Sequence, residues 1–95
     1  MVEILLADSA WDDLDSITDY IALDSIRYAK EFSYNLFERI QQLKSFPQSG
    51  RIVPEFNEDK IRELIFGRYR IVYRIYGPEK IVILRIVHGA KLLDW

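Results

Sequence analysis

Residues 69–88 read YRIVYRIYGPEKIVILRIVH, and this stretch predicts a β-hairpin. Over residues 69–76 the side chains alternate between two sets, as in a strand with two unlike faces. The sets are Tyr69, Ile71, Tyr73 and Ile75 on one face, and Arg70, Val72 and Arg74 on the other. Gly77-Pro78-Glu79 then supplies a turn, and residues 80–87 are nearly continuous in β-branched residues, which is typical of a central strand.

The segment before this hairpin, residues 46–66, is predicted to contain a helix end, a loop and one more strand. Ile61–Phe66 is an apolar run that ends at Gly67, so we expect an antiparallel meander of three strands. Residues 51–60 are polar and contain Pro54, which predicts a loop. The segment Phe46–Gly50 contains a proline and ends in glycine, and it is expected to terminate a preceding helix.

The first half of the chain predicts a short strand over residues 2–7 and then two amphipathic helices. Ser9 opens a serine-x-x-acid pattern typical of a helix start, and Asp24 or Ser25 can cap the second helix. Helical spacing relates two sets of apolar residues: Ala10, Leu14, Ile17 and Ile21 in the first helix, and Ala29, Phe32, Leu36, Ile40 and Leu43 in the second. The order β-α-α-β-β-β predicts an α+β fold, with a helical hairpin packed on a mostly antiparallel sheet and residues 1–95 forming a single domain.

Composition restricts the classes of function. The chain has 95 residues, no cysteine and one histidine, so we expect no disulfide framework, no zinc site and no cofactor. The N-terminal run lacks the basic residues of a signal peptide, and no apolar run approaches the roughly 20 residues that span a bilayer. A cytoplasmic protein without membrane contact is therefore expected.

Charge is distributed unevenly along the chain. Residues 1–50 hold nine acidic and four basic residues, whereas residues 51–95 hold six acidic and nine basic residues. An acidic helical side and a basic sheet side are expected, and such asymmetry bears on the choice of partners. Ordinary solvated faces are the alternative explanation.

Several runs, in order, resemble one known family. They are Ala10–Leu14 with Ile17 and Ile21, Leu43–Glu55 with its Phe46-Pro47 and Gly50-Arg51 pairs, Ile61–Leu64, Tyr69–Arg74 and Ile83–Gly89. Together they resemble the RelE/ParE superfamily of toxins from type II toxin–antitoxin systems, and the resemblance covers essentially the whole chain. It implies a bacterial growth-inhibiting toxin, of the kind that serves in plasmid stabilization, which is neutralised by a cognate antitoxin whose C-terminal segment wraps it.

The resemblance leaves the target of the toxin open. ParE-like members poison DNA gyrase without hydrolysis, whereas RelE-like and YoeB-like members cut messenger RNA on the ribosome. The acidic overall charge and the absence of a tyrosine after Tyr76 favour gyrase, because the nucleases usually carry a tyrosine near the C-terminus. A degenerate toxin that only binds its antitoxin is a third alternative.

If the chain is a nuclease, resemblance to the YoeB type assigns three catalytic roles without any metal. Glu55 stands at the general base, Arg70 at the phosphate clamp and His88 at the general acid, with Arg85 and Lys91 as candidate phosphate contacts. Each residue also has an ordinary structural explanation: Glu55 as an ion-paired loop acid, Arg70 and Arg74 as a solvated strand face, and His88 as a strand end bonded to backbone. Whether these side chains share a face depends on the strand register.

The C-terminal tail is the candidate partner-binding element. Leu92, Leu93 and Trp95 follow a glycine and need apolar surroundings, either in the sheet of the protein itself or on a partner. A partner contact is the favoured interpretation, because chain ends are usually the least constrained segments.

Overall fold

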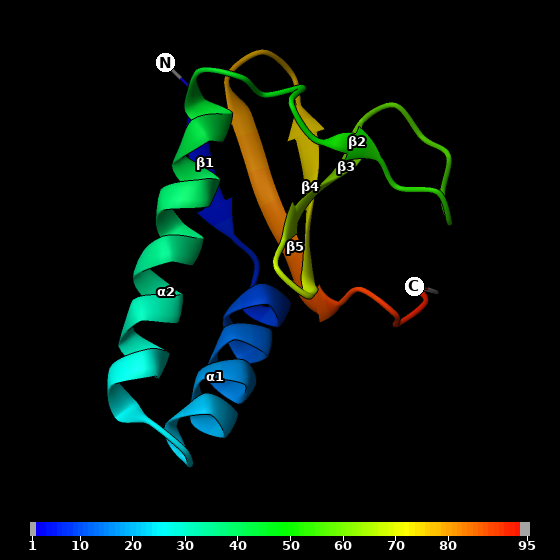
Figure 1. Ribbon diagram of the computed structural model, residues 1–95. Coiled ribbons are helices and arrows are strands. Elements are labelled where there is room, and N and C mark those ends of the chain that lie inside the picture. Colours follow the sequence, from blue (N-terminus) through cyan, green and yellow to red (C-terminus); the bar gives the residue numbers. More distant parts are fainter. Residues whose placement is uncertain (1, 94–95) are drawn as a thin grey trace.

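The computed structural model describes residues 2–93 and contains two helices packed on one side of a five-stranded sheet (Figure 1). The elements are β1 (Glu3–Leu6), α1 (Asp8–Ala22), α2 (Ile26–Gln41), a 3₁₀ turn (Gln42–Lys44), β2 (Arg51–Ile52), β3 (Ile61–Phe66), β4 (Tyr69–Tyr76) and β5 (Lys80–His88). The strand order is β1-β5-β4-β3-β2, and within residues 2–93 only the β1–β5 pair is parallel. The predicted α+β fold is confirmed, and β5 is an interior strand as expected.

The expected loop over residues 51–60 contains one short strand. In β2, Arg51 pairs with Glu63 and Ile52 pairs with Arg62 of β3. Two residues are too few to show an alternating pattern, so the sequence does not reveal this strand. Its pairing with β3 is accompanied by a hydrogen bond from Arg51 Nε to Glu63 Oε2 at 2.6 Å, between residues 12 positions apart.

The start of α1 differs from the expectation. The helix begins at Asp8 with Ala7 at the cap position, and no side chain caps it. Ser9 Oγ instead donates to the carbonyl of Leu84 at 2.7 Å, and Asp13 Oδ2 accepts from the Ile86 amide at 2.9 Å. The β1–β5 pairing ends at Ile83, so the backbone groups along the rest of this edge of β5 have no strand partner. Side chains of α1 hydrogen-bond to them instead.

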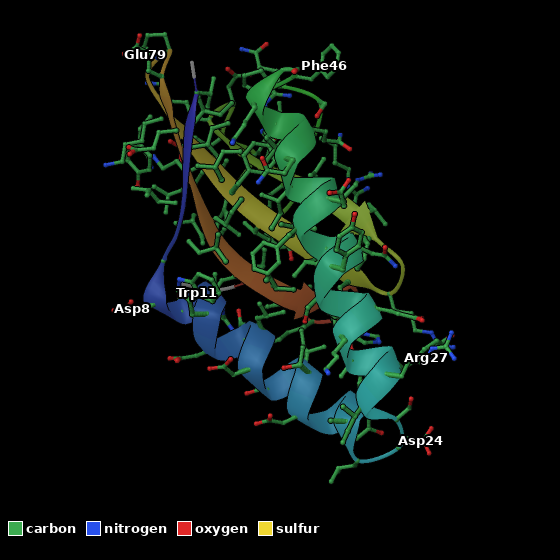
Figure 2. The ribbon with its side chains drawn as sticks, turned by 90° about the vertical axis from the view of Figure 1, so that its left-hand side faces the viewer. Asp8, Trp11, Asp24, Arg27, Phe46 and Glu79 are labelled. Carbon is green, nitrogen blue, oxygen red and sulfur yellow. The ribbon has the colours of Figure 1, made fainter. Side chains whose placement is uncertain are left out.

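The helical hairpin forms as predicted. Ser25 is the cap of α2, and its hydroxyl accepts from the Tyr28 amide at 3.1 Å. Figure 2 shows Asp24 and Arg27 at the tip of the hairpin, while Phe46 lies at the opposite end of α2. In the part of the chain that the structure describes, neither helix is long and apolar enough to cross a membrane.

The core has two parts, one on each face of the sheet. The larger part lies under the helices and contains the predicted stripes, including Leu14, Leu36 and Ile40, together with Ile71 and Ile83. A smaller cluster on the other face is formed by Val53, Ile61, Val72, Val87 and Leu93, with Phe56 packed against them. The face of β4 that carries Val72 is therefore partly buried, and the alternative that Arg70 lies on a solvated face is wrong, since Arg70 is only 5% exposed.

A buried tyrosine holds the turn after the second helix. Tyr73 Oη donates to the Pro47 carbonyl at 2.8 Å and accepts from the Gly50 amide at 2.9 Å, and burial raises the pKa of this phenol. Gly50 is required here by space, because a Cβ would lie 2.6 Å from both Tyr73 Oη and the Glu63 carbonyl oxygen. This anchor directs the chain from α2 into β2.

Candidate functional site

The most elaborate polar site of the described residues is centred on Arg70 in β4. Its guanidinium donates to both oxygens of Glu55 at 2.7 Å, and Nε donates to Glu63 Oε1 at 2.7 Å. Nη2 also lies 2.6 Å from Glu63 Oε1, and Nη1 donates to the Lys91 carbonyl at 3.1 Å. The protein itself thus supplies acceptors for four of the five N–H donors of this arginine, and an ion-pair contact with Glu63 to the Nη2 nitrogen.

Glu63 connects this arginine to a second one. Its side chain is fully buried, with one oxygen on Arg70 and the other on Arg51, whose own side chain is 61% exposed. A buried carboxylate is tolerated only when it is paired and hydrogen-bonded, as it is here. Glu55, Arg70, Glu63 and Arg51 thus form a neutral chain of alternating charges, which we call the Arg70 network.

Glu55 ties the C-terminal tail to the same network. Its Oε2 accepts from the Leu93 amide at 3.0 Å in addition to the bond from Arg70. The hydrogen bond from Arg70 is the main reason that the pKa of Glu55 falls from 4.5 to about 2. At neutral pH the carboxylate is ionised, but its low pKa and filled coordination leave it a weak proton acceptor.

The lowered pKa predicts an acid-sensitive fold. Because the folded-state pKa of Glu55 lies below the unfolded value, its contribution to stability is complete above pH 4.5 and disappears as the pH falls toward 2. Glu55→Gln should remove this contribution, so the free energy of unfolding of the variant should decline less steeply between these pH values. Urea unfolding at a series of pH values measures the slope.

Glu58→Gln is the matched control for this prediction. Glu58 is half exposed and lies 3.9 Å from Arg74, so its removal should leave the pH dependence almost unchanged. Equal slopes for the Glu55→Gln variant and the unmodified protein would contradict the assignment.

His88 lies apart from the Arg70 network. It is exposed at the end of β5, its Nδ1 accepts from the Ala90 amide at 3.3 Å, and its ring centroid is 5.9 Å from that of Tyr69. In the β4–β5 register His88 pairs with Tyr69, whereas Arg70 pairs with Val87. Since neighbouring residues of a strand point to opposite faces, His88 and Arg70 lie on opposite sides of the sheet.

The two candidate phosphate contacts are also separate. Arg85 donates to Asp13 of α1 through Nε at 2.7 Å and Nη2 at 3.0 Å, which places it at the β5 edge. Lys91 is exposed, and only its carbonyl oxygen joins the Arg70 network. The structure therefore brings Glu55 and Arg70 together but does not gather the five nuclease candidates around one point.

The tail residues have unlike environments. Leu92 is 76% exposed, as expected for a partner contact, whereas Leu93 is 5% exposed within the smaller core cluster. The expectation that Leu93 lies on a contact surface is corrected, because its side chain packs in the protein itself and its amide is held by Glu55. Trp95 lies outside the described residues.

Sequence reasoning did not select Glu63, Arg51 or Asp13. The signal for Glu63 was an acid between two apolar residues of its own strand face, Ile61 and Ile65, where a solvated charge is unusual. Nothing local pointed to Asp13, whose partners are 72 and 73 residues away. Among residues 2–93, no three histidine, cysteine or acidic side chains are placed to hold a metal ion.

Comparison with known proteins gives a consistent result. The family model described as the ParE toxin of the type II toxin–antitoxin system parDE matches residues 4–93. A solved structure of the chromosomal ParDE TA system from P. aeruginosa is 25% identical and superimposes with a TM-score of 0.74, covering 93% of this chain and 96% of that one. No curated protein matches the chain.

Proposed function

The chain belongs to the ParE toxin family of type II toxin–antitoxin systems, and from this membership we propose that it inhibits DNA gyrase without catalysing a reaction of its own. Its role is that of a toxin, and membership of the family implies an antitoxin as its partner. Gyrase is the target that the resemblance to ParE-like toxins implies. The alternative within the wider superfamily is cleavage of ribosome-bound messenger RNA.

The observation that supports gyrase over RNA cleavage is the state of Arg70. Cleavage of RNA needs a cation at the scissile phosphate, together with a base and an acid within hydrogen-bond reach of the reacting oxygens. Arg70 makes four hydrogen bonds and a further ion-pair contact within its own chain, and Glu55 is ion-paired with it. His88, the candidate acid, lies on the opposite face.

The test is a supercoiling assay with purified gyrase, ATP and relaxed plasmid. We expect the toxin to suppress supercoiling and to cause linear plasmid to accumulate after the gyrase is digested. Toxin that is first mixed with its antitoxin serves as the control and should have no effect. In cells, induced expression should produce filaments and a DNA-damage response.

The contrary outcome is equally specific. If gyrase activity is unaffected while message is cut at codon-spaced positions in a translating extract, the toxin is a ribosome-dependent nuclease. A protein that does neither but still binds the antitoxin is a degenerate toxin.

A further inference from the structure

Part of the sheet face that is turned away from the helices has no cover among the described residues. Figure 1 shows both helices on the other side, and the smaller core cluster covers this face around Ile61 of β3, Val72 of β4 and Val87 of β5. On the remaining part, Leu5 of β1 pairs with Val82 of β5, which pairs in turn with Arg74 of β4. Two residues further along these strands, Lys80 of β5 pairs with Tyr76 of β4. Residues two apart on a strand share a face, so these five form one surface, here called the open sheet patch.

The patch is both apolar and cationic. Leu5 is 42% exposed and Tyr76 45% exposed, which are high values for apolar side chains in the middle and at the end of strands. The guanidinium carbon of Arg74 lies 5.0 Å from the centroid of the Tyr76 ring, and Lys80 Nζ lies 6.0 Å from it. Two positive charges are therefore held beside an exposed aromatic ring.

Arg74 has donors to spare, unlike Arg70. Its Nε is buried without a hydrogen-bond partner among the described residues, and its one ion pair, with Glu58, is long at 3.9 Å. A guanidinium matches the geometry of a carboxylate or a phosphate. The Arg74 side chain is 34% exposed, so its exposed part, and not the buried Nε, is open to an acceptor from a partner molecule.

We propose that the open sheet patch docks an extended segment of the cognate antitoxin that carries acidic and apolar side chains. The family implies a protein partner, and the charge of Arg74 and Lys80 selects for carboxylates on it. A nucleic acid is the other polyanion that two cations could bind, and the second probe below tests for it. This inference rests on the family and does not depend on gyrase being the target.

The test measures binding of the purified antitoxin to the double variant Arg74→Glu/Lys80→Glu. Loss of two matched charges at the centre of an interface should weaken the affinity by roughly 30-fold or more. The affinity of the unmodified toxin should fall as salt is raised, and that of the variant should fall less. Lys30→Glu, an exposed change on α2, is the control and should bind as the unmodified toxin does.

A second probe separates the antitoxin from the toxin's target. Binding of a fluorescent 20-nucleotide DNA strand and inhibition of gyrase are measured on the same proteins, and the double variant should match the unmodified toxin in both. If the double variant binds antitoxin normally, or loses only DNA binding or gyrase inhibition, the proposal is wrong. Thermal melting checks that each variant is folded. If the double variant is unfolded, antitoxin binding by the single variant Lys80→Glu tests the proposal instead, since Lys80 is exposed and has no ion pair among the described residues.

Discussion

Arg70→Ala should lower the free energy of unfolding by about 3–5 kcal/mol, because it leaves the buried Glu63 carboxylate without its main partner. The same change releases Glu55, which in turn holds the Leu93 amide. Proteins of this size are stable by only about 5–14 kcal/mol in total, so this loss removes a large share of the stability. Urea unfolding and thermal melting measure the loss.

Two further variants identify the cause of this loss. Arg27→Ala removes an arginine whose side chain is 90% exposed and paired with Glu31, and it should change stability by no more than about 0.5 kcal/mol. Adding Glu63→Gln to Arg70→Ala should restore part of the stability, since a neutral amide is easier to bury than an unpaired carboxylate. An Arg70→Ala protein with the same melting temperature as the unmodified protein would show that the Arg70 network is not a source of stability.

The Arg70 network also affects how toxicity experiments are interpreted. A strand-face arginine is expected to tolerate alanine, but here the side chain is only 6% exposed and makes four hydrogen bonds. Loss of toxicity in Arg70→Ala would therefore follow from unfolding as readily as from loss of a catalytic cation. Only toxicity measured together with melting separates the two causes.

Leu93→Ala should cost about 2–5 kcal/mol, whereas Leu92→Ala should stay within about 0.5 kcal/mol of the unmodified protein. The two leucines are neighbours of identical chemistry, but Leu93 is 5% exposed and Leu92 is 76% exposed. Truncation to alanine leaves a cavity beside Val72 and Val87 in the first case and removes only a solvated side chain in the second. Chemical unfolding of both variants measures the difference.

The same pair tests whether the tail takes part in binding. If Leu92 contacts the antitoxin, Leu92→Ala should weaken that complex while the free toxin remains stable. Equal stabilities of the two variants would show that residue 93 is not part of the core.

Local patterns in the sequence determined the elements of this fold. Helical spacing, strand alternation and turn residues act over a few positions, so the helical hairpin, the sheet of β3, β4 and β5 and the α+β class were all predictable. The family resemblance was also readable, because it depends on such runs in order. Of the candidate site, the sequence identified Glu55 and Arg70 as notable and offered an ion pair of Glu55 as one alternative, but it did not identify Arg70 as the partner.

The tertiary structure alone decided which of these residues meet. The β4–β5 register places His88 on the face opposite Arg70, and a shift of one residue would have reversed this, since side chains alternate with a period of two. The burial of Glu63 and Leu93 depends on a loop and a tail that close over the second face of the sheet, and the bond between Asp13 and Ile86 joins positions 73 residues apart. Contacts of this kind depend on how whole elements pack, and no local pattern records them.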